Sequence, residues 1–491
     1  MHYELGAGSA GVTRAPFDVC IFGTGPAGLT VALELGRAGK RVALIEAGAF
    51  EYTEESQAFY EGTESGISLW NSLKLKRLRY FGGTSGMWSG RCGLFDDIDF
   101  SAETYHGLPG WPITRKAVLE HLARAADILD LGQQSLAARP VKDGVTSNFV
   151  RSSVALSPPT RFADKYRREV VESANIHLFT RANLVELRLG ASPRGKSSLD
   201  HAVLKTYDGK AFRISGKRYV LALGAIENAR LLLNSDRQVP GGIGNHAGYV
   251  GRYFMEHLNV QIGRFVVRDE SYFPESRLEL SPGRQLLESQ RIGNGVLTLH
   301  PSHIPKDFGR LRYIKRILRE GVCEFETLRE YARKFEDFNC TGEGVVTTLL
   351  EQSPNPESRV SLGADVDSLG LRKVHLHWAI NDSDRRTIRV LGIALAKELA
   401  RLDAARMKLS DFILDDSRPI QPVGHHSHHM GTTRMSRDPR HGVVDENCRV
   451  HGVANLYVAG SSVFPTGGGT NPTLTIVLLA LRLAGHLRKS A

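Results

Sequence analysis

Two segments near the C-terminus concentrate side chains that could act in catalysis. The first, residues 424–435, contains His425, His426, His428 and His429. Imidazole changes its protonation near neutral pH and is also the commonest metal ligand. We expect no metal, because successive side chains on a strand diverge and no nearby acid or cysteine completes a ligand set at the usual spacing. Two interpretations stay open, a structural or solvated histidine cluster and a catalytic base supplied by one member.

The second segment, residues 464–474, runs from three glycines into the start of a helix. Asn471 followed by Pro472 is typical of a helix N-terminus, because Asn accepts hydrogen bonds from free amides and Pro suits the first helical position. One interpretation of Asn471 is therefore a helix cap. The other is functional, because the partial positive charge at a helix N-terminus would stabilise an anion such as the N1–C2=O region of a reduced flavin.

The elements that must position these side chains begin near the N-terminus. An apolar strand at 17–22 runs into a GxGxxG turn at 23–28, a helix follows, and a second strand at 42–45 is closed by Glu46. This order is typical of a dinucleotide-binding βαβ unit. The acid is placed to accept hydrogen bonds from ribose hydroxyls, and the helix N-terminus faces the negative charge of a pyrophosphate.

Each glycine of this turn has a physical role. Gly23 allows the tight turn, Gly25 lets a pyrophosphate approach the backbone, and Gly28 lets the helix pack against the strand. A second glycine-rich stretch, residues 241–248, follows Pro240 and a polar run rather than a strand, so we do not assign it a nucleotide. With one dinucleotide site, a prosthetic flavin fits better than a flavin reduced by bound NAD(P)H.

Other parts of the chain add to the same open sheet. Residues 219–233 are predicted as a buried strand, a turn at Gly224 and a helix, and residues 455–460 as a strand entering a glycine turn. Glu227 and Asn228 are predicted as helix-start residues rather than substrate ligands.

Residues 256–420 have a different pattern. Period-two stretches at 359–362 and 373–378 are separated by long charged helical runs, which predicts an antiparallel sheet with helices. The fold class is therefore α/β, a Rossmann-like FAD-binding domain with a second α+β substrate domain built on an antiparallel sheet. The predicted bounds are 15–255 and 421–491 for the FAD-binding domain, with 95–165 contributing cap and connecting segments, and 256–420 for the substrate-binding domain.

Four motifs together resemble the glucose–methanol–choline (GMC) oxidoreductases. They are the GxGxxG turn with Glu46, the YFGGTSGMWSG stretch at 80–90, the HxxGTxRM pattern starting at His428, and the NPTLT run from Asn471. The resemblance is tight over residues 17–48, 78–100 and 424–488 and looser through the middle. It is closest to the bacterial sugar-oxidising members and the pyranose oxidases, which use a His/Asn pair.

The resemblance implies a role for each member of that pair. His428 corresponds to the catalytic base that faces the flavin, and Asn471 to its partner that hydrogen-bonds the substrate hydroxyl. The implied reaction is FAD-dependent oxidation of an alcohol, in which neutral His428 removes the hydroxyl proton while the carbinol carbon delivers hydride to flavin N5. An alkoxide-like transition state needs such a base and a fixed dipole on the oxygen. His257 lies in a stretch that the family also has, and we predict a structural role for it.

The resemblance also implies the cofactor contacts. Met87 stands where members with covalently attached flavin carry histidine, so FAD is predicted to bind non-covalently. Met87 and Trp88 could equally be packing residues. The implied cofactor-binding residues are Gly23, Gly25, Pro26, Ala27, Gly28, Glu46, Ala47, Gly82, Gly83, Thr84, Ser85, Trp88, Ser89, Leu184, Ala222, Gly460, Ser461, Asn471, Pro472 and Thr473.

The implied substrate is a small-molecule alcohol, namely a sugar, glycoside or polyol hydroxyl oxidised to a ketone or aldehyde. The electron acceptor would be oxygen, a quinone or a protein carrier, and a homo-oligomer is compatible with the sequence. One alternative is an oxidase or dehydrogenase of a non-sugar alcohol, such as a natural-product or aminoglycoside intermediate. Another is a catalytically inactive flavin-binding interaction protein.

The net charge of +10 is concentrated in two clusters of the 491-residue chain. Residues 306–319 combine six basic side chains with an apolar stripe. This pattern is typical of a helix that lies on a membrane surface or binds an acidic partner, and also of a helix that packs through its apolar stripe and leaves its charged face in solvent. Lys74, Lys76, Arg77 and Arg79 precede the predicted flavin loop and could face phosphate. Neither cluster has interleaved aromatics, so we expect no nucleic-acid partner.

The five cysteines are too few and too scattered for a disulfide framework, and none forms a CxxC pair. A reducing compartment, the cytoplasm, is therefore expected. Residues 1–16 lack the pattern of an export signal, and the apolar stretch at 474–481 is far shorter than a transmembrane segment. We expect a soluble protein.

Overall fold

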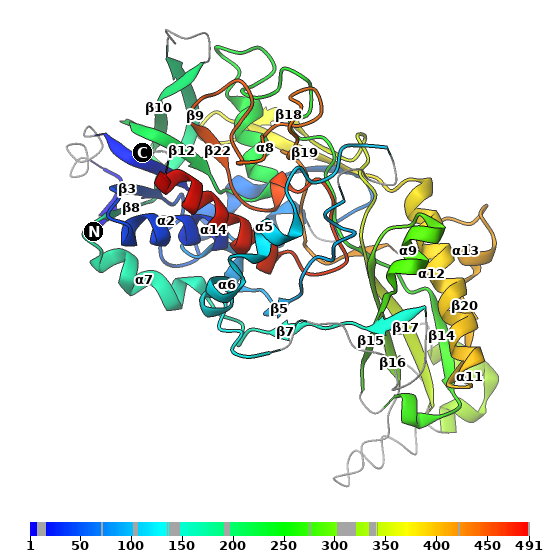
Figure 1. Cartoon of the computed structure of the whole chain (residues 1–491). Coiled ribbons are helices and arrows are strands. Elements are labelled where there is room, and N and C mark those ends of the chain that lie inside the picture. Colours follow the sequence, from blue (N-terminus) through cyan, green and yellow to red (C-terminus); the bar gives the residue numbers. More distant parts are fainter. Residues whose placement is uncertain are drawn as a thin grey trace.

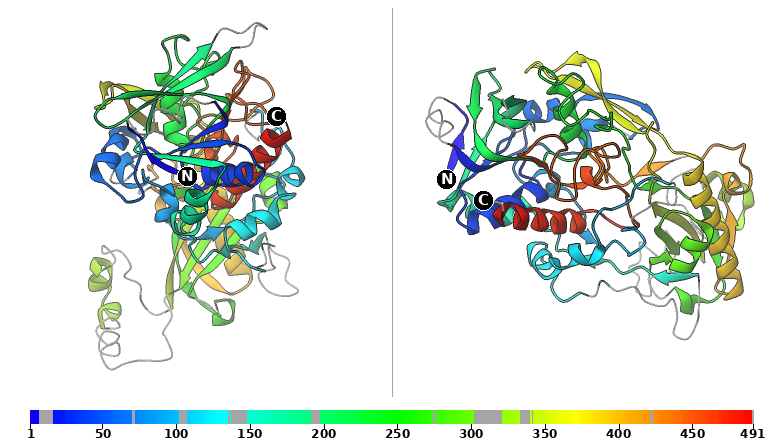
Figure 2. Two further views of the ribbon diagram at one scale, coloured as in Figure 1. Left: turned by 90° about the vertical axis from the view of Figure 1, so that its left-hand side faces the viewer. Right: turned by 45° about the horizontal axis from the view of Figure 1, so that its top comes forward.

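The computed structural model describes residues 1–6, 16–69, 72–101, 107–134, 136, 148–190, 197–273, 276–301, 321–332, 340, 342–420 and 423–489. Two bodies built on separate sheets are visible in Figure 1, one formed by both ends of the chain and the other by its middle. Both chain ends lie beside the first sheet (Figure 2). This arrangement confirms the predicted α/β class, in which distant segments share the nucleotide-binding sheet.

The first sheet has six parallel strands. Its order is β1-β8-β3-β2-β12-β22. The interior strands are nearly continuous runs of buried apolar residues, as expected for a parallel sheet with both faces covered. The bounds are β1 His2–Glu4, β2 Phe17–Phe22, β3 Val42–Ile45, β8 Ile176–Thr180, β12 Gly216–Leu221 and β22 Leu456–Val458.

Helices from opposite ends of the chain cover this sheet. Helix α2 (Pro26–Arg37) follows the glycine turn, and α14 (Thr473–Lys489) packs against it (Figure 1). The predicted strand, turn and helix around Gly224 are confirmed as β12 and α8 (Ala225–Asn234). The loop at 241–248 forms neither helix nor strand, which agrees with its rejection as a nucleotide site.

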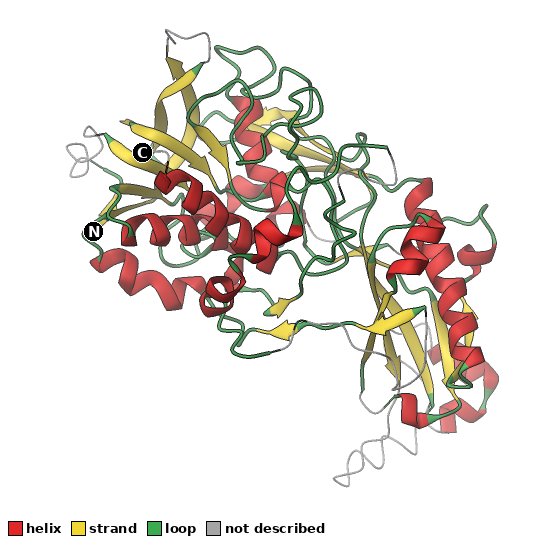
Figure 3. Ribbon diagram, in the orientation of Figure 1, coloured by secondary structure: helices red, strands yellow, loops and turns green. Residues whose placement is uncertain are grey.

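The second sheet is antiparallel and has eight strands. Its order is β20-β14-β17-β16-β15-β6, and the short strands β13 and β21 pair with each other beside β17. Helix α12 (Asp382–Arg401) packs along the edge strand β20 (Figure 3). The strands are β6 Phe149–Arg151, β13 Leu258–Asn259, β14 Gly263–Val267, β15 Leu278–Pro282, β16 Gly295–Pro301, β17 Glu343–Leu350, β20 Ala405–Leu409 and β21 Gly424–His425.

The two period-two stretches at 359–362 and 373–378 are not in this second sheet. They belong to β18 (Arg359–Val366) and β19 (Arg372–Trp378), which pair antiparallel with each other, as expected, but then join β4 (Gly62–Gly66). Strand β18 packs against α8 of the nucleotide-binding body. The expectation was wrong on this point because alternation shows that a strand has one buried face, without identifying the sheet that covers it.

The remaining elements are short connecting pieces. Strands β9 Asn183–Gly190, β10 Ser198–Lys205 and β11 Ala211–Ile214 form a three-stranded sheet, and β5 Arg91–Cys92 pairs with β7 Ala155–Leu156. The other helices are α3 Glu54–Gln57, α4 Ser72–Leu75, α5 Arg115–Leu119, α6 Leu122–Ile128, α7 Phe162–Glu172, α9 Arg284–Gln290, α11 Glu326–Ala332 and α13 Asp411–Leu414, with 3₁₀ turns η2 Ala58–Tyr60, η3 Gly83–Gly86, η4 Glu270–Tyr272 and η5 Ser461–Val463.

The domain bounds stay a prediction, although β6 shows that the predicted cap and connecting region also contributes a strand to the second sheet. The basic segment 306–319 lies outside the described residues. Within the described part of the chain, no helix combines the length and apolar character needed to cross a bilayer.

One disulfide was not anticipated from the sequence. Cys323 is bonded to Cys340, with Cα atoms 5.8 Å apart, whereas Cys20, Cys92 and Cys448 are buried free thiols. We expected no disulfide framework, and this single pair was not predicted. A separation of 17 residues matches no recognised cysteine motif, so nothing local identified the partners.

Thiol counting tests this bond. Protein denatured without reductant should expose the three free thiols, and all five after reduction. Cys323→Ser should expose one thiol more than the unreduced wild type, because Cys340 loses its partner. Reduction should also lower stability by about 3 kcal/mol, the usual effect of opening a loop of this size. Five thiols before reduction would contradict the bond.

Candidate functional site

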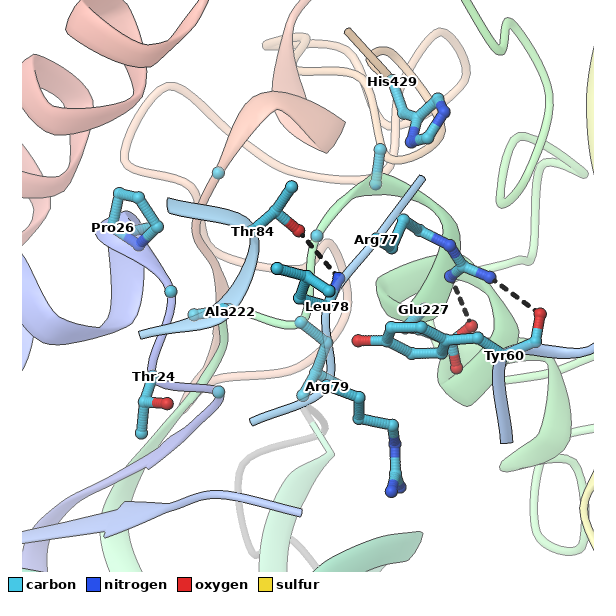
Figure 4. A pocket seen from close by; sticks show the side chains of 18 of the residues that line it. Thr24, Pro26, Tyr60, Arg77, Leu78, Arg79, Thr84, Ala222, Glu227 and His429 are labelled. Atoms are coloured by element: carbon cyan, nitrogen blue, oxygen red, sulfur yellow. Dashed lines mark hydrogen bonds and ion pairs between the residues drawn. The ribbon is translucent and has the colours of Figure 1, made fainter. Parts of the chain in front are cut away.

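A single cavity of about 470 Å³ joins the nucleotide unit to the histidine segment. Its walls come from the ends of β2, β3, β12 and β22, from the 78–89 loop, and from the segments before α8 and α14 (Figure 4). All of the predicted site residues line it except Gly28 and Gly82. Parallel pairing explains the convergence, because the carboxyl ends of neighbouring strands meet at one edge of the sheet.

Gly28 and Gly82 do not line the cavity, but they allow the segments that form its wall to pack closely. A Cβ at Gly28 would lie 2.0 Å from the carbonyl oxygen of Gly23, so only glycine lets α2 approach the turn this closely. Gly82 has a φ of +89°, and its N–H donates to Thr24 Oγ1 at 3.1 Å. The two glycines therefore fix the glycine turn and the 82–86 loop against each other.

Glu46 lies at the nucleotide end of the cavity. Its carboxylate is 5% exposed, accepts hydrogen bonds from Thr24 and from the Gly48 N–H, and follows directly after β3. Each carboxylate oxygen offers two lone pairs, so capacity is left for ribose hydroxyls. A Cβ at Gly25 would meet no atom within 4 Å, so the helix N-terminus opens onto free space. These features fit the adenosine and diphosphate parts of FAD.

The predicted phosphate-facing cluster is mostly engaged within the protein. Lys74 pairs with Glu54 and Glu61, and Arg79 donates to Asn183 at 2.8 Å. Arg77 pairs with Glu227 at 2.7 Å and lies 4.0 Å from the Tyr60 ring centroid (Figure 4). Lys76 lines the cavity, and a phosphate-facing role stays a prediction for it.

Glu227 is the centre of a buried ion-pair network. It occupies the first turn of α8, as expected, but also lines the cavity and pairs with Arg230 at 3.3 Å in addition to Arg77. Arg230 also pairs with Asp367 at 2.7 Å. Burial alone would raise the pKa of Glu227, but the guanidinium groups of Arg230 and Arg77 outweigh it and leave the pKa lowered. The network braces α8 against the 60–79 region.

His428 and Asn471 meet at the other end of the cavity. His428 follows β21 on the second sheet, and Asn471 precedes α14 on the first. The amide Nδ2 of Asn471 lies 3.1 Å from His428 Nε2. Burial, reinforced by His257 and the other nearby histidines, holds the pKa of His428 well below its usual value. The imidazole is therefore neutral at neutral pH, the protonation state that a proton acceptor requires.

A third residue of this group, His257, was not predicted. Its Nδ1 lies 2.8 Å from His428 Nδ1, and its Nε2 lies 2.8 Å from the carbonyl oxygen of Gly468. Sequence reasoning assigned it a structural role because the two histidines are 171 positions apart and no spacing rule connects them. The local signal available was the Glu256-His257 pair just before a strand.

Glu256 holds the histidine segment in place. Its fully buried carboxylate accepts the backbone N–H of His257 and of His428, each at 2.8 Å. Burial raises the pKa of Glu256 to about 8, against the opposing effect of these backbone donors. Ser427 has a φ of +60°, an uncommon conformation for a residue other than glycine. The carboxylate thus stabilises a strained loop at the site.

Ligand atoms of Glu256, His257 and His428 all lie within 4.8 Å of one another, close enough to hold a metal ion. The Glu256 carboxylate already accepts backbone N–H groups, and the two rings are joined Nδ1 to Nδ1. The expected absence of a metal stays a prediction. The other histidines have separate environments, since His426 Nε2 bonds the Thr348 carbonyl and His429 Nε2 lies 3.8 Å from Glu256 Oε2.

Comparisons with known proteins agree with this geometry. A family model described as GMC oxidoreductase matches residues 354–480, and one described as FAD binding domain matches residues 16–60. The 6'''-hydroxyparomomycin C oxidase of Streptomyces lividus is 30% identical over 57% of this chain and 47% of that protein. The chain thus spans about half the length of this relative and of the next one, paromamine 6'-oxidase of Streptomyces fradiae.

Other relatives align differently. The 2-methyl-1,2-propanediol dehydrogenase of Mycolicibacterium austroafricanum is 23% identical over 96% of this chain and 95% of that protein. The C-glycoside 3-oxidase of Microbacterium trichothecenolyticum is 38% identical over 25% of this chain and 23% of that protein. Among solved structures, a fungal aryl-alcohol oxidase covers 97% of this chain and 99% of its own, with a TM-score of 0.60 and 16% identity, a likeness of fold.

The Glu227 network yields a stability prediction. Glu227→Gln should destabilise the protein by about 3 kcal/mol at neutral pH, because two buried guanidinium groups lose a charged partner. A lowered folded-state pKa means that the carboxylate stabilises the fold above its unfolded pKa and that this stabilisation is lost as pH falls through the folded value. The difference between wild type and variant should therefore shrink on acidification below the ordinary pKa of 4.5.

Urea unfolding at neutral and acidic pH measures both effects. Glu172→Gln is the matched control, because its Arg168 pair is an exposed i,i+4 pair on α7 and should contribute little. A Glu227→Gln variant as stable as this control at neutral pH would contradict the role of the network.

Proposed function

The chain belongs to the GMC oxidoreductases, and on that premise we propose that it is an FAD-dependent enzyme that oxidises an alcohol group of a sugar, glycoside or polyol. The product would be the corresponding ketone or aldehyde. The observation that carries the proposal is the pairing of His428 Nε2 with Asn471 Nδ2, 3.1 Å apart, in a cavity that also contains the nucleotide-binding turn.

FAD fits the residues that line the cavity: Glu46 would hold the ribose, the N-terminus of α2 the diphosphate and the 83–89 loop the remainder. Bound FAD supplies the hydride acceptor. Met87 is 47% exposed and cannot form the histidyl link of covalent members, which supports non-covalent binding.

His428 and Asn471 have different roles at the substrate hydroxyl. Neutral His428 accepts the hydroxyl proton at Nε2, and the Asn471 N–H hydrogen-bonds the same oxygen as it gains negative charge. The carbinol carbon gives up its hydride in the same reaction, so the neutral alcohol becomes a carbonyl compound without an added oxidant beyond the flavin. Asn471 at the positive end of α14 is well placed to stabilise that charge.

Charge near the site favours an uncharged substrate over an aminoglycoside intermediate. After burial, the positive charge of Lys76 contributes to lowering the pKa of His425, whereas Arg91, which contributes at His426, is paired with Glu279. The acids Glu227 and Asp367, which also line the cavity, pair with arginines. A substrate with several ammonium groups would meet repulsion there.

Oxygen, a quinone or a protein carrier is proposed as the electron acceptor, and homo-oligomer formation stays a prediction. A cytoplasmic location also stays a prediction of the sequence. The Cys323–Cys340 disulfide weighs against it, because such bonds persist mainly in oxidising compartments.

Flavin bleaching tests the activity. The purified protein should be yellow, release FAD into the supernatant on acid precipitation, and lose flavin absorbance when mixed without oxygen with a monosaccharide, glycoside or polyol. A simple diol and an aminoglycoside complete the panel, and turnover in air compared with a quinone dye identifies the acceptor. A protein that stays colourless after incubation with added FAD and removal of the excess would exclude FAD, and a yellow one that no alcohol bleaches would favour the interaction-protein alternative.

His428→Ala tests the base. The rate of flavin bleaching should fall by about 100- to 10,000-fold, the usual contribution of a general base, while FAD stays bound. His246→Ala is the control, because His246 is exposed and outside the cavity. Bleaching of the His428→Ala protein at the wild-type rate would assign the base to another residue.

A further inference from the structure

His257 is buried between His428 and the glycine loop that leads to Asn471. Both of its ring nitrogens are engaged, Nδ1 with His428 Nδ1 at 2.8 Å and Nε2 with the Gly468 carbonyl oxygen at 2.8 Å. Its side chain is 0% exposed, so water does not compete for either nitrogen. The two rings are nearly perpendicular, with an interplanar angle of 89°, and the short contact joins one nitrogen of each.

The partners of His257 decide where its proton lies. A carbonyl oxygen can only accept, so Nε2 of His257 must be the nitrogen that carries hydrogen. Burial lowers the pKa of His257 to about 3, so the ring is neutral and has one N–H. Its Nδ1 is therefore a lone pair, and the hydrogen in the contact between the two histidines must belong to Nδ1 of His428.

The contact on the opposite side of the His428 ring independently indicates which of its nitrogens carries hydrogen. The amide nitrogen of Asn471 faces His428 Nε2 at 3.1 Å, and an amide nitrogen can only donate. Nε2 of His428 is thus an acceptor that carries no hydrogen. Both contacts select one tautomer of His428, with hydrogen on Nδ1 and none on Nε2.

We propose that His257 is a positioning residue that holds His428 in the tautomer whose Nε2 lone pair faces Asn471 and the cavity. The inference rests on the proposed role of His428 as the base. A neutral imidazole with hydrogen on Nε2 would present a donor to the substrate hydroxyl and could not accept its proton. His257 excludes that tautomer, because Nε2–H would leave two lone pairs facing each other between the rings.

A neutral acceptor on Nδ1 fixes the tautomer of His428 without adding a negative charge beside the ring. A carboxylate on Nδ1 would favour the charged imidazolium, which has no lone pair to offer. Here the carboxylate of Glu256 is directed to the backbone N–H groups of His257 and His428, while the ring contact is made by an imidazole. When His428 takes up the substrate proton on Nε2, its Nδ1–H bond to His257 remains in place.

Nitrogen NMR on the holoenzyme reads the tautomer directly. Protein labelled with ¹⁵N-histidine should show one histidine with protonated Nδ1 and bare Nε2 whose signals disappear in His428→Asn. A protonated Nε2 on that residue at neutral pH would overturn the proposal. This NMR measurement determines the tautomer in the wild-type protein, so it does not depend on how a His257 variant folds.

Two variants separate the contacts of His257. His257→Asn retains an acceptor oxygen near the position of Nδ1 but cannot reach Gly468, whereas His257→Gln can donate toward Gly468 but has no acceptor near Nδ1. We expect His257→Gln to lower kcat for flavin bleaching by about 10- to 100-fold with little change in KM, and to shift the His428 proton to Nε2. His257→Asn should stay within a few-fold of wild type.

A His257→Gln enzyme with wild-type kcat and an unchanged His428 tautomer would overturn the proposal, as would equal losses in both variants without a tautomer change. Failure of the proposed function is a separate result, since it would appear as undiminished bleaching in His428→Ala. FAD absorbance and thermal unfolding of each variant establish that cofactor and fold are retained.

Discussion

The carboxylate of Glu256 holds together two segments that are 172 positions apart in the chain. It accepts backbone N–H groups from both, so the histidine loop and the residue before β13 form one unit, with Ser427 fixed in a left-handed conformation. Hydrogen bonds within a protein contribute about 0.5–1.5 kcal/mol each, and a buried donor left without its acceptor costs about 1–3 kcal/mol. The orientation of His428 toward Asn471 depends on this anchor.

The site lies where two sheets of different character meet. The parallel sheet brings the glycine turn, Glu46 and the residues after β22 to its carboxyl edge, and the antiparallel sheet supplies His257 and His428 through its two shortest strands. Arg77 and Arg230 beside the cavity are both paired with Glu227. If FAD binds as proposed, its diphosphate would meet the N-terminus of α2 rather than a cluster of free arginines.

Local patterns were sufficient for much of this architecture. The strand-turn-helix units at Gly23 and Gly224 are visible in the sequence because their periodicity and glycines are local, and the motifs at His428 and Asn471 identify the pair that the fold brings to 3.1 Å. Relationships between distant segments were not visible. The partner strand of β19, the Cys323–Cys340 bond and the contact of His257 with His428 each depend on which segments the fold brings together.

The packing of α2 against α14 has a consequence for synthesis of the protein. The glycine turn leaves the ribosome early, but β22, Asn471 and α14 follow more than 400 residues later, after the whole second sheet has emerged. At a translation rate of about 5–20 residues per second, the nascent βαβ unit waits roughly 20 seconds or more for the strand and helix that complete its sheet. The residues that would bind FAD are therefore all present only after α14 has begun to emerge, more than 400 residues after the glycine turn.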